Sequence, residues 1–345
     1  MKRNKSKLSI FLYVLWIIAA VIIVVYIFRD LNPKIVYRTV KSLTKLIFLV
    51  MVACFLGSIF EYKAWYRFAS FLASPLVRFG RLPKVSGTAF LVALFSNPAA
   101  NTIITGSYEE GKITRKEMFI SGLCNSYPAM VSHSLRILFP LVGAIGLAAV
   151  YYYSITFGVG LLMTFMFLTY SRIKSSNIYN GPIDIKSLNK TQLSWNEIFR
   201  KSAKRTLKVL IRMLVMTVPL YIIFLYASKK GIFTAWNNFI PSGLENFISP
   251  QIMSVLIARF GGLVNAAGVA SEFLPSHEIT SLQIVFAFLL GNIITNPIRS
   301  IRRNLPVALG IFPNKDGLWI VLILQIMRFI FILASVIIIM VYISS

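Results

Sequence analysis

Hydrophobic residues along this chain form long runs separated by short polar and basic segments. An uncharged run of 20 residues, 9–28, follows a basic start, and another apolar run, at about 318–343, lies near the end. Because about 20 apolar residues cross the roughly 30 Å hydrocarbon core of a membrane, such runs predict transmembrane helices. We therefore predict an all-α polytopic membrane protein with about seven transmembrane helices. The other spans are expected at about 46–62, in a broken segment before Pro140, from Pro140 to about 170, and at about 207–228 and 279–298.

Two further apolar segments are too short to cross a membrane and are interrupted by polar residues, glycine or proline. The first runs from Thr88 to Phe95, breaks at Ser96-Asn97-Pro98 and resumes from Ala99 to Gly106. The second covers about 250–275 and breaks at Gly261-Gly262. Irregular backbone is stable at membrane depth only where it is buried in protein or lines a watery cavity. We therefore predict two re-entrant hairpins, each with its polar tip buried in the protein.

The two halves of the chain repeat the same order of features, offset by about 166 residues. Ile113-Thr114 matches Ile279-Thr280, and the polar break at Asn125 to Pro128 falls near Asn292 to Pro297. Three predicted spans separate the hairpins, and an odd number places the two repeats in opposite orientations. The predicted divisions are an N-terminal helix with a basic linker (1–45), a first repeat (46–170), a basic cytoplasmic loop (171–205) and a second repeat (206–345).

The charge of the chain favours one orientation in the membrane. The formal net charge is +25, and most of the 36 Lys and Arg residues fall on one side of the predicted layout. Because cytoplasmic loops carry an excess of these residues, we expect a multi-pass protein of the cell membrane with a cytoplasmic N-terminus. The basic loop is expected to meet anionic membrane lipid. No basic, aromatic nucleic-acid module is present, so nucleic acid is not an expected partner.

Motifs of enzyme chemistry are absent from the sequence. We find no Walker loop, dinucleotide fingerprint, zinc-protease motif, paired Cys motif or serine-nucleophile elbow. The two cysteines, Cys54 and Cys124, lie within apolar stretches. We therefore expect no enzyme activity, no cofactor and no metal site. The expected partners are membrane lipid and a small-molecule or lipid substrate, and a homo-oligomer is left open.

Polar residues inside the apolar segments are the candidate substrate-binding residues. Two interrupted hydrophobic segments at corresponding positions of two halves point to a transporter-type site near the middle of the membrane. The competing interpretation is that each side chain only satisfies backbone groups freed at a break. The candidates are Ser96, Asn97, Asn101, Asn125, Ser126, Arg136, Arg259, Asn265, Asn292 and Asn296.

Three arginines, Arg136, Arg259 and Arg328, also fall within apolar segments. A cation at the centre of a bilayer costs about 2.5–3.5 kcal/mol on insertion scales, so it usually faces a cavity or a partner. Few acidic residues lie near the membrane, which favours an anionic ligand or lipid headgroup. The alternatives are snorkelling and an internal ion pair such as Arg259 with Glu272. His133 is expected to be an ordinary helix residue.

Four segments carry a resemblance to a known family. They are Pro75 to Pro83, Phe95 to Thr102, Glu109 to Ile113 and Asn125 to Pro128. In these segments the chain resembles the nucleoside-recognition, or gate, family of integral membrane proteins, most of all its uncharacterised archaeal members. Gate-type segments occur in concentrative nucleoside transporters, ferrous-iron transport proteins and bacterial spore maturation proteins. The resemblance covers about residues 46–170 well and about 207–312 more weakly.

The pattern and the resemblance together predict a permease whose substrate lies between the two hairpin tips. Arg136, and with it Arg259, would supply positive charge, and the asparagines would orient the ligand. An anionic small molecule or lipid phosphate is the first choice of substrate. The tips carry no acidic residue that would bind a ribose, so a nucleoside is the second choice. The alternative is a non-transporting membrane scaffold or signalling subunit related to spore maturation proteins.

Overall fold

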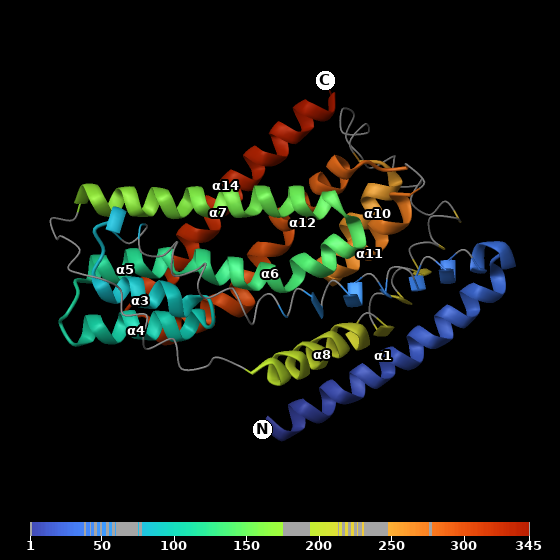
Figure 1. Ribbon diagram of the computed structural model, residues 1–345, viewed down its shortest axis with the longest axis horizontal. Helices are drawn as coiled ribbons and strands as arrows, with labels where there is room; N and C mark the ends of the chain where they lie inside the picture. Colours follow the sequence, from blue (N-terminus) through green and yellow to red (C-terminus); the bar gives the residue numbers. More distant parts are fainter. Residues whose placement is uncertain are drawn as a thin grey trace.

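The computed structural model describes residues 2–37, 78–174, 194–212, 248–275 and 278–344, with scattered positions between 39 and 75 and between 214 and 230. Within these residues every regular element is a helix (Figure 1). The helices are α1 (Lys2–Asp30), α3 (Lys84–Ala93), α4 (Asn97–Glu109), α5 (Arg115–Cys124), α6 (Ser126–Ile145), α7 (Leu147–Lys174), α8 (Trp195–Arg212), α10 (Pro250–Gly261), α11 (Leu263–Phe273), α12 (Ser281–Arg299), η4 (Ser300–Asn304), α13 (Leu305–Ile311) and α14 (Asp316–Ser344).

Among the residues that the structure describes, four helical segments are long and apolar enough to cross a membrane. They are Arg115–Ile145, Leu147–Lys174, Ser281–Ile311 and Asp316–Ile343. The protein is therefore an all-α protein with the helices of a multi-pass membrane protein. The helix α1 contains the predicted N-terminal run, whereas the predicted spans at 46–62 and 207–228 are described only in part.

Each predicted hairpin is a pair of short helices packed side by side, α3 with α4 and α10 with α11. The first turns at Ser96, whose hydroxyl caps α4 by accepting a hydrogen bond from the Ala99 backbone N–H at 3.3 Å. The second turns at Gly262, whose φ of 127° is open to glycine but strained for other residues. At 1.5 Å per residue, helices of 10 to 13 residues extend only about 15–20 Å, too little to cross a membrane.

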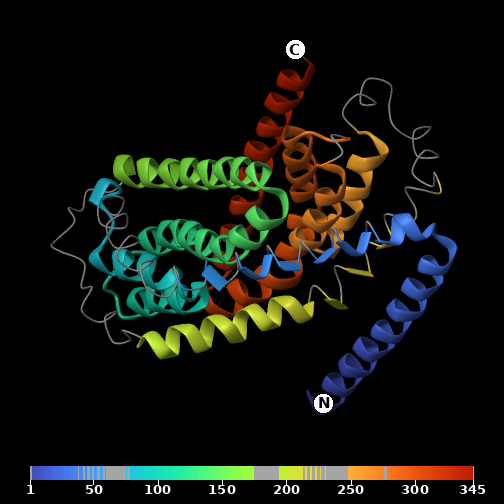
Figure 2. The ribbon, with the colours of Figure 1, turned by 45° about the vertical axis from the view of Figure 1, so that its right-hand side comes forward.

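The two repeats are arranged in opposite directions. The helix α7 begins beside the second hairpin, where Ala148 and Ala149 pack into its core, and ends beside the first, where Leu168 packs with Leu82. Its counterpart α14 begins beside the first hairpin and ends beside the second. The hairpins accordingly lie at opposite ends of the molecule in both views (Figures 1 and 2). The helices α7 and α14 therefore run in opposite directions between the two hairpins.

Each hairpin is enclosed by helices of the other repeat. The end of α6 packs against α11, and in the equivalent contact α13 packs against α4. The core around α10 and α11 includes Leu141 and Ile145 of α6, and the core around α3 and α4 includes Ala308 and Phe312 from the end of the second repeat. The two repeats therefore form one structure rather than two separable domains.

The structure corrects the predicted positions of three helix boundaries. Pro140 does not begin the fourth span: it lies inside α6, and the helix ends at Gly146, which adopts φ 55°. Asn125 keeps helical angles of φ −60° and ψ −19°, so α5 and α6 join with little interruption. Asn292 and Asn296 are not at a break, because α12 continues to Arg299. The irregular turn follows instead in the π-helix η4, close after Pro297, which lacks a backbone N–H.

The long polar segment between the repeats is partly helical. The helix α7 continues to Lys174, and α8 begins at Trp195, within the range predicted to be a basic loop. Ser194 and Glu197 explain this start, because each side chain accepts a hydrogen bond from the backbone N–H of the other residue. The described helix therefore begins before the span predicted from residue 207.

Candidate functional site

Among the described residues, Arg259 stands out as a buried cation in the last turn of α10, before the hairpin tip. It is only 3% exposed. Its Nη2 donates a hydrogen bond to Asn292 Oδ1 at 2.6 Å, while Nε and Nη1 are buried without a hydrogen-bond partner. The predicted alternative of an ion pair with Glu272 is therefore not formed. A buried charge without a counter-charge is costly, which makes this position a candidate ligand site.

The position of Arg259 depends on a glycine of the neighbouring helix. A Cβ atom placed on Gly291 of α12 would lie 2.5 Å from Arg259 Cγ. Gly291 is therefore required for the close approach of the arginine to α12, rather than for a special backbone angle. This contact places the guanidinium beside the next residue of α12, Asn292.

Asn292 links the arginine to the first repeat. It is buried, and its Nδ2 donates a hydrogen bond to the hydroxyl of Tyr152, on α7, at 2.8 Å. Tyr152 packs edge-on against Phe288, with ring centroids 5.5 Å apart. The chain Arg259–Asn292–Tyr152 thus joins α10 and α12 of the second repeat to α7 of the first.

Two more arginines lie near the hydrogen-bonded series Arg259–Asn292–Tyr152. Arg299, at the end of α12, interacts electrostatically with Arg259 and Tyr152, and Arg328 of α14 interacts with Tyr152 and Arg299. Among the described residues, no carboxylate forms an ion pair with any of the three arginines. We refer to Arg259, Arg299 and Arg328 as the basic cluster. Its composition suits an anion, because arginine binds phosphate and carboxylate through paired N–H donors.

The predicted cation Arg136 lies further from the centre. It is an exposed residue of α6, one turn after His133. His133 interacts electrostatically with Arg136 and also with Arg299 and Arg303. Arg136 therefore extends the positive potential of the basic cluster outward. The sequence analysis named Arg136 as the main source of positive charge and Arg259 as the second. In the structure Arg259 is the buried cation, and Arg136 is exposed.

A second set of candidates gathers on the first hairpin. Asn97, Asn101 and Thr105 follow one another at four-residue intervals on α4 and so share a helix face. Asn125 Nδ2 donates a hydrogen bond to Asn101 Oδ1 at 3.0 Å. Buried oxygens without a partner remain on Asn97, Thr105 and Asn125. We call these four residues the asparagine stripe.

The remaining candidates mainly satisfy backbone groups. Ser96 caps α4, Ser126 donates to the Leu123 carbonyl at 2.7 Å, and Asn265 Nδ2 donates to the Gly261 carbonyl at 2.9 Å. The simpler of the two predicted interpretations therefore accounts for these hydrogen bonds. Asn296 is half-buried on α12, one turn after Asn292.

The candidates form two clusters rather than one site between the tips. The basic cluster belongs to the second hairpin and its surroundings, whereas the asparagine stripe belongs to the first hairpin, and neither α3 nor α4 packs against α10 or α11. Sequence reasoning missed Tyr152, Thr105 and Arg299. Thr105 was detectable from its four-residue spacing to Asn101, and Arg299 from its position at the end of a predicted span. Nothing in the Tyr151–Tyr153 run distinguished Tyr152 from its neighbours.

The described residues offer no arrangement for metal-based chemistry. No group of three His, Cys, Asp or Glu side chains among them has the geometry to hold a metal ion. Cys124 is buried at the end of α5. Among these residues, the functional groups that stand out are guanidinium, amide and phenol groups, which bind and orient ligands.

Three uncharacterised proteins of Methanocaldococcus jannaschii are similar to this chain. MJ0871 is 26% identical over 274 residues, which make up 78% of this chain and 84% of that protein. MJ1556 is 26% identical over 262 residues, covering 75% of this chain and 82% of that protein. MJ0880 is 21% identical over 278 residues, covering 78% and 88%. No family model and no solved structure matches the chain. The similarity thus extends over most of each protein and is not confined to one shared segment.

Proposed function

We propose that this protein is a membrane permease for an anionic small molecule or a lipid phosphate. The observation that carries the proposal is Arg259, a 3% exposed guanidinium with two nitrogens that lack a partner. An anion bound there would satisfy both nitrogens and compensate the buried charge. The absence of an ion-paired carboxylate at Arg299 and Arg328, within the described chain, supports an anion over a cation or a neutral nucleoside.

The location of the basic cluster supports transport rather than static binding. Its members come from α10, α12 and α14 of the second repeat, and its hydrogen-bond chain ends on α7 of the first. A relative movement of the repeats would therefore change the environment of a ligand held there. In the proposed mechanism, the second hairpin and its arginine move against the helices of the first repeat to give alternating access.

The exposed cations of α6 and η4 have a role in this scheme. Arg136 and Arg303 are exposed, and both interact electrostatically with His133, as Arg299 does. Exposed positive charges near the buried Arg259 would draw an anion inward. The asparagine stripe, on the other hairpin, is a separate polar surface and is not part of this anion site.

The membrane layout is part of the proposal. Seven spans, two re-entrant hairpins and a cytoplasmic N-terminus in the cell membrane are consistent with the distribution of Lys and Arg. In this layout the first hairpin enters from the cytoplasm and the second from outside. The basic cluster would then lie within the membrane, where a cation is most costly and a bound anion most stabilising.

The experiment is a ligand screen by thermal unfolding of the purified protein in phosphate-free buffer, followed by uptake into proteoliposomes. Inorganic phosphate, pyrophosphate, nucleotides, isoprenyl phosphates and uncharged nucleosides are compared for wild type, Arg259→Gln and Arg302→Gln. Arg302 is an exposed arginine of η4 and carries the same charge change. Because a hydrogen bond to a charged group contributes about 1.5–3 kcal/mol, Arg259→Gln should weaken binding of the active anion at least about tenfold.

The expected result is that one class of anion stabilises wild type and Arg302→Gln but not Arg259→Gln, and that the same class is taken up. Ligand binding raises the free energy of unfolding by RT ln(1 + [L]/Kd), so weak ligands register at high concentration. Stabilisation by uncharged nucleosides that survives in Arg259→Gln would overturn the anion proposal. The absence of any ligand response in wild type would favour the scaffold alternative.

A further inference from the structure

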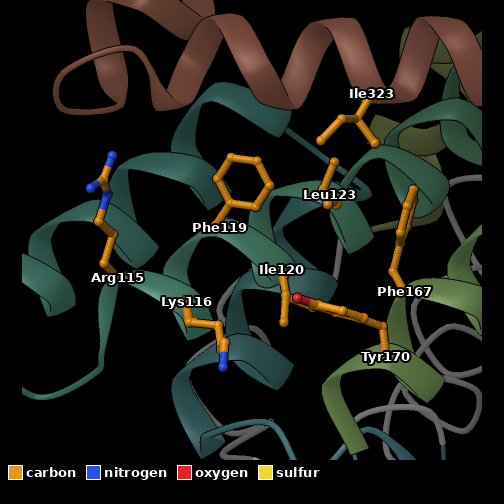
Figure 3. A pocket seen from close by; sticks show the side chains of 8 residues that line it. All are labelled: Arg115, Lys116, Phe119, Ile120, Leu123, Phe167, Tyr170 and Ile323. Atoms are coloured by element: carbon orange, nitrogen blue, oxygen red, sulfur yellow. The ribbon is translucent and has the colours of Figure 1, made fainter. Parts of the chain in front are cut away.

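A groove lies between three helices, and its lining includes none of the three arginines of the basic cluster. It has a volume of about 580 Å³ and is open to the surface between α5, α7 and α14 (Figure 3). Cavities of 300–1,000 Å³ are typical of small-molecule sites. The groove is lined by Arg115, Lys116, Phe119, Ile120, Leu123, Phe167, Tyr170 and Ile323.

The walls of the groove are apolar along their length and basic at one end. Figure 3 shows the Phe119 ring in the middle of the groove, with Leu123 and Phe167 beyond it and Ile323 facing them from α14. The two basic residues occupy the first turn of α5, and Tyr170, from the last part of α7, lies across the side of the groove. A groove that is basic at one end and apolar along its length matches a lipid molecule, which has a charged headgroup and an apolar tail.

The positive charge at this end is only partly compensated. Arg115 donates two hydrogen bonds to the Asp316 carboxylate, at 2.9 and 2.8 Å, and so holds the start of α14 against α5. Lys116 is exposed, and no carboxylate of the described chain forms an ion pair with it. Lys116 is therefore the cation available to a headgroup, and Arg115 adds N–H donors beside it.

The second repeat shows that the fold does not require these charges. Thr114 and Glu117 form a capping box at the start of α5, and Thr280 and Gln283 form the same box at the start of α12. When the two repeats are aligned on these capping boxes, Ser281 and Leu282 are equivalent to Arg115 and Lys116. A neutral first turn therefore supports the same helix start in the second repeat. The ion pair with Asp316 explains Arg115, whereas no contact within the described chain explains Lys116.

We propose that the groove binds an anionic membrane lipid, with its phosphate at Lys116 and an acyl chain along Phe119, Leu123 and Ile323. Charge complementarity selects the anionic headgroup, and the apolar walls select the chain. In the orientation proposed above, this end of α5 lies at the cytoplasmic leaflet, where basic residues meet anionic lipids. The site is separate from the basic cluster, and the inference does not depend on transport.

The experiment compares thermal unfolding in detergent with added phosphatidylglycerol or phosphatidylcholine. The variants are Lys116→Leu, which installs the residue of the second repeat, and Lys84→Leu, the same change at an exposed lysine that begins α3 and does not line the groove. At lipid concentrations of about 10–100 times Kd, we expect phosphatidylglycerol to raise the Tm of wild type by roughly 3–6 °C more than phosphatidylcholine does. Lys116→Leu should lose most of this difference, and Lys84→Leu should keep it.

A third variant tests the acyl chain. Ile323→Trp adds volume to the groove wall and should reduce the effect of phosphatidylglycerol while leaving both cations in place. The proposal is overturned if wild type does not distinguish the two lipids, or if Lys116→Leu and Lys84→Leu lose the response equally. Loss of the response in Arg259→Gln, with Lys116→Leu unaffected, would also overturn it by placing the lipid at the basic cluster.

Discussion

At the scale of single residues, the charges of two arginines are compensated in different ways. Arg115 reaches the Asp316 carboxylate through two hydrogen bonds and remains partly exposed. Arg259 is buried with one hydrogen bond to a neutral amide. A charge held in this way lowers the stability of the empty protein and becomes favourable only when a counter-charge binds.

This contrast predicts the sign of a stability change. Arg259→Met replaces the buried cation by an apolar side chain of similar length. In the absence of ligand, we expect the free energy of unfolding to stay the same or to rise by about 1–3 kcal/mol, because an unsatisfied buried group is removed. Thermal unfolding in phosphate-free detergent solution measures this change. A large loss of stability would identify Arg259 as a structural residue and contradict the proposed binding role.

Gly291 provides a test that leaves the arginine itself intact. In Gly291→Ala the new methyl group would meet Arg259 Cγ and displace the guanidinium. We expect overpacking to cost about 1–3 kcal/mol and anion binding to weaken as well. The control is Gly158→Ala on α7, where nothing lies within 4 Å of the added carbon. Both variants are measured by thermal unfolding with and without ligand. Equal stability and equal ligand response would show that the contact between Gly291 and Arg259 contributes to neither stability nor anion binding.

The sequence identified individual residues better than their contacts. Arg259 and Asn292 were both recognisable as polar residues in apolar segments. Their hydrogen bond joins positions 33 residues apart, and the one from Asn292 to Tyr152 joins positions 140 apart. Such contacts depend on how α7, α10 and α12 pack, and local pattern carries no information about that packing. The partner of a buried polar residue therefore had to come from the structure.

At the scale of helices, the two hairpins make the same turn by different means. The first uses a serine cap followed by Pro98 at the start of α4, where proline is well tolerated. The second uses Gly262, which serves both as the end of α10 and as the residue preceding α11. Equivalent positions thus have different chemistry, and only the second tip depends on a backbone conformation that favours glycine.

This difference predicts that the second tip is sensitive to loss of glycine. Gly262→Ala keeps open space around the side chain but forces alanine into φ 127°. We expect a cost of about 1–3 kcal/mol, read as a lowered temperature of thermal unfolding. Gly106→Ala in α4 is the matched control, because its surroundings are open and its backbone is helical. If Gly262→Ala were as stable as this control, the tip would have to be rearranged relative to the structure.

Helix starts were easier to predict than helix ends. The Ile-Thr pair, recognised in the sequence only as a feature of both repeats, stands at the starts of α5 and α12, where each threonine caps its helix through short-range hydrogen bonds. Pro140 was misleading, since proline is tolerated inside α6 while Gly146, with its positive φ, ends the helix. The π-helical turn at η4 follows Pro297, which marked an irregularity but did not show that the turn would begin only after Arg299.

At the scale of the whole molecule, the sequence predicted inverted repeats but not the way in which each hairpin is enclosed by helices of the other half. The offset of matching features indicated a duplication, and the number of intervening spans indicated its inversion. That α6 covers the second hairpin and α13 the first could not be predicted, because these are contacts between distant segments. The orientation in the membrane remains a prediction from charge.

Labelling from one side of the membrane tests that orientation. Cysteine is placed at Glu110, at the base of the first hairpin, or at Glu278, at the base of the second, in a chain carrying Cys54→Ser and Cys124→Ala. Both glutamates are exposed. A membrane-impermeant maleimide should label position 278 in intact cells and position 110 only in permeabilised cells. Labelling of both positions from the same side would contradict the inverted layout.

The mutual enclosure of the hairpins has a consequence for biosynthesis. Helices α3 and α4 leave the ribosome about 200 residues before α13, which completes their core. At a translation rate of about 5–20 residues per second, α13 is synthesised roughly 10–40 s after the first hairpin. During this interval the apolar surface of the hairpin is uncovered, and the hairpin needs lipid or the insertion machinery as a temporary neighbour. A nascent chain arrested before α13 is therefore expected to be a substrate for membrane quality control, however well its own helices form.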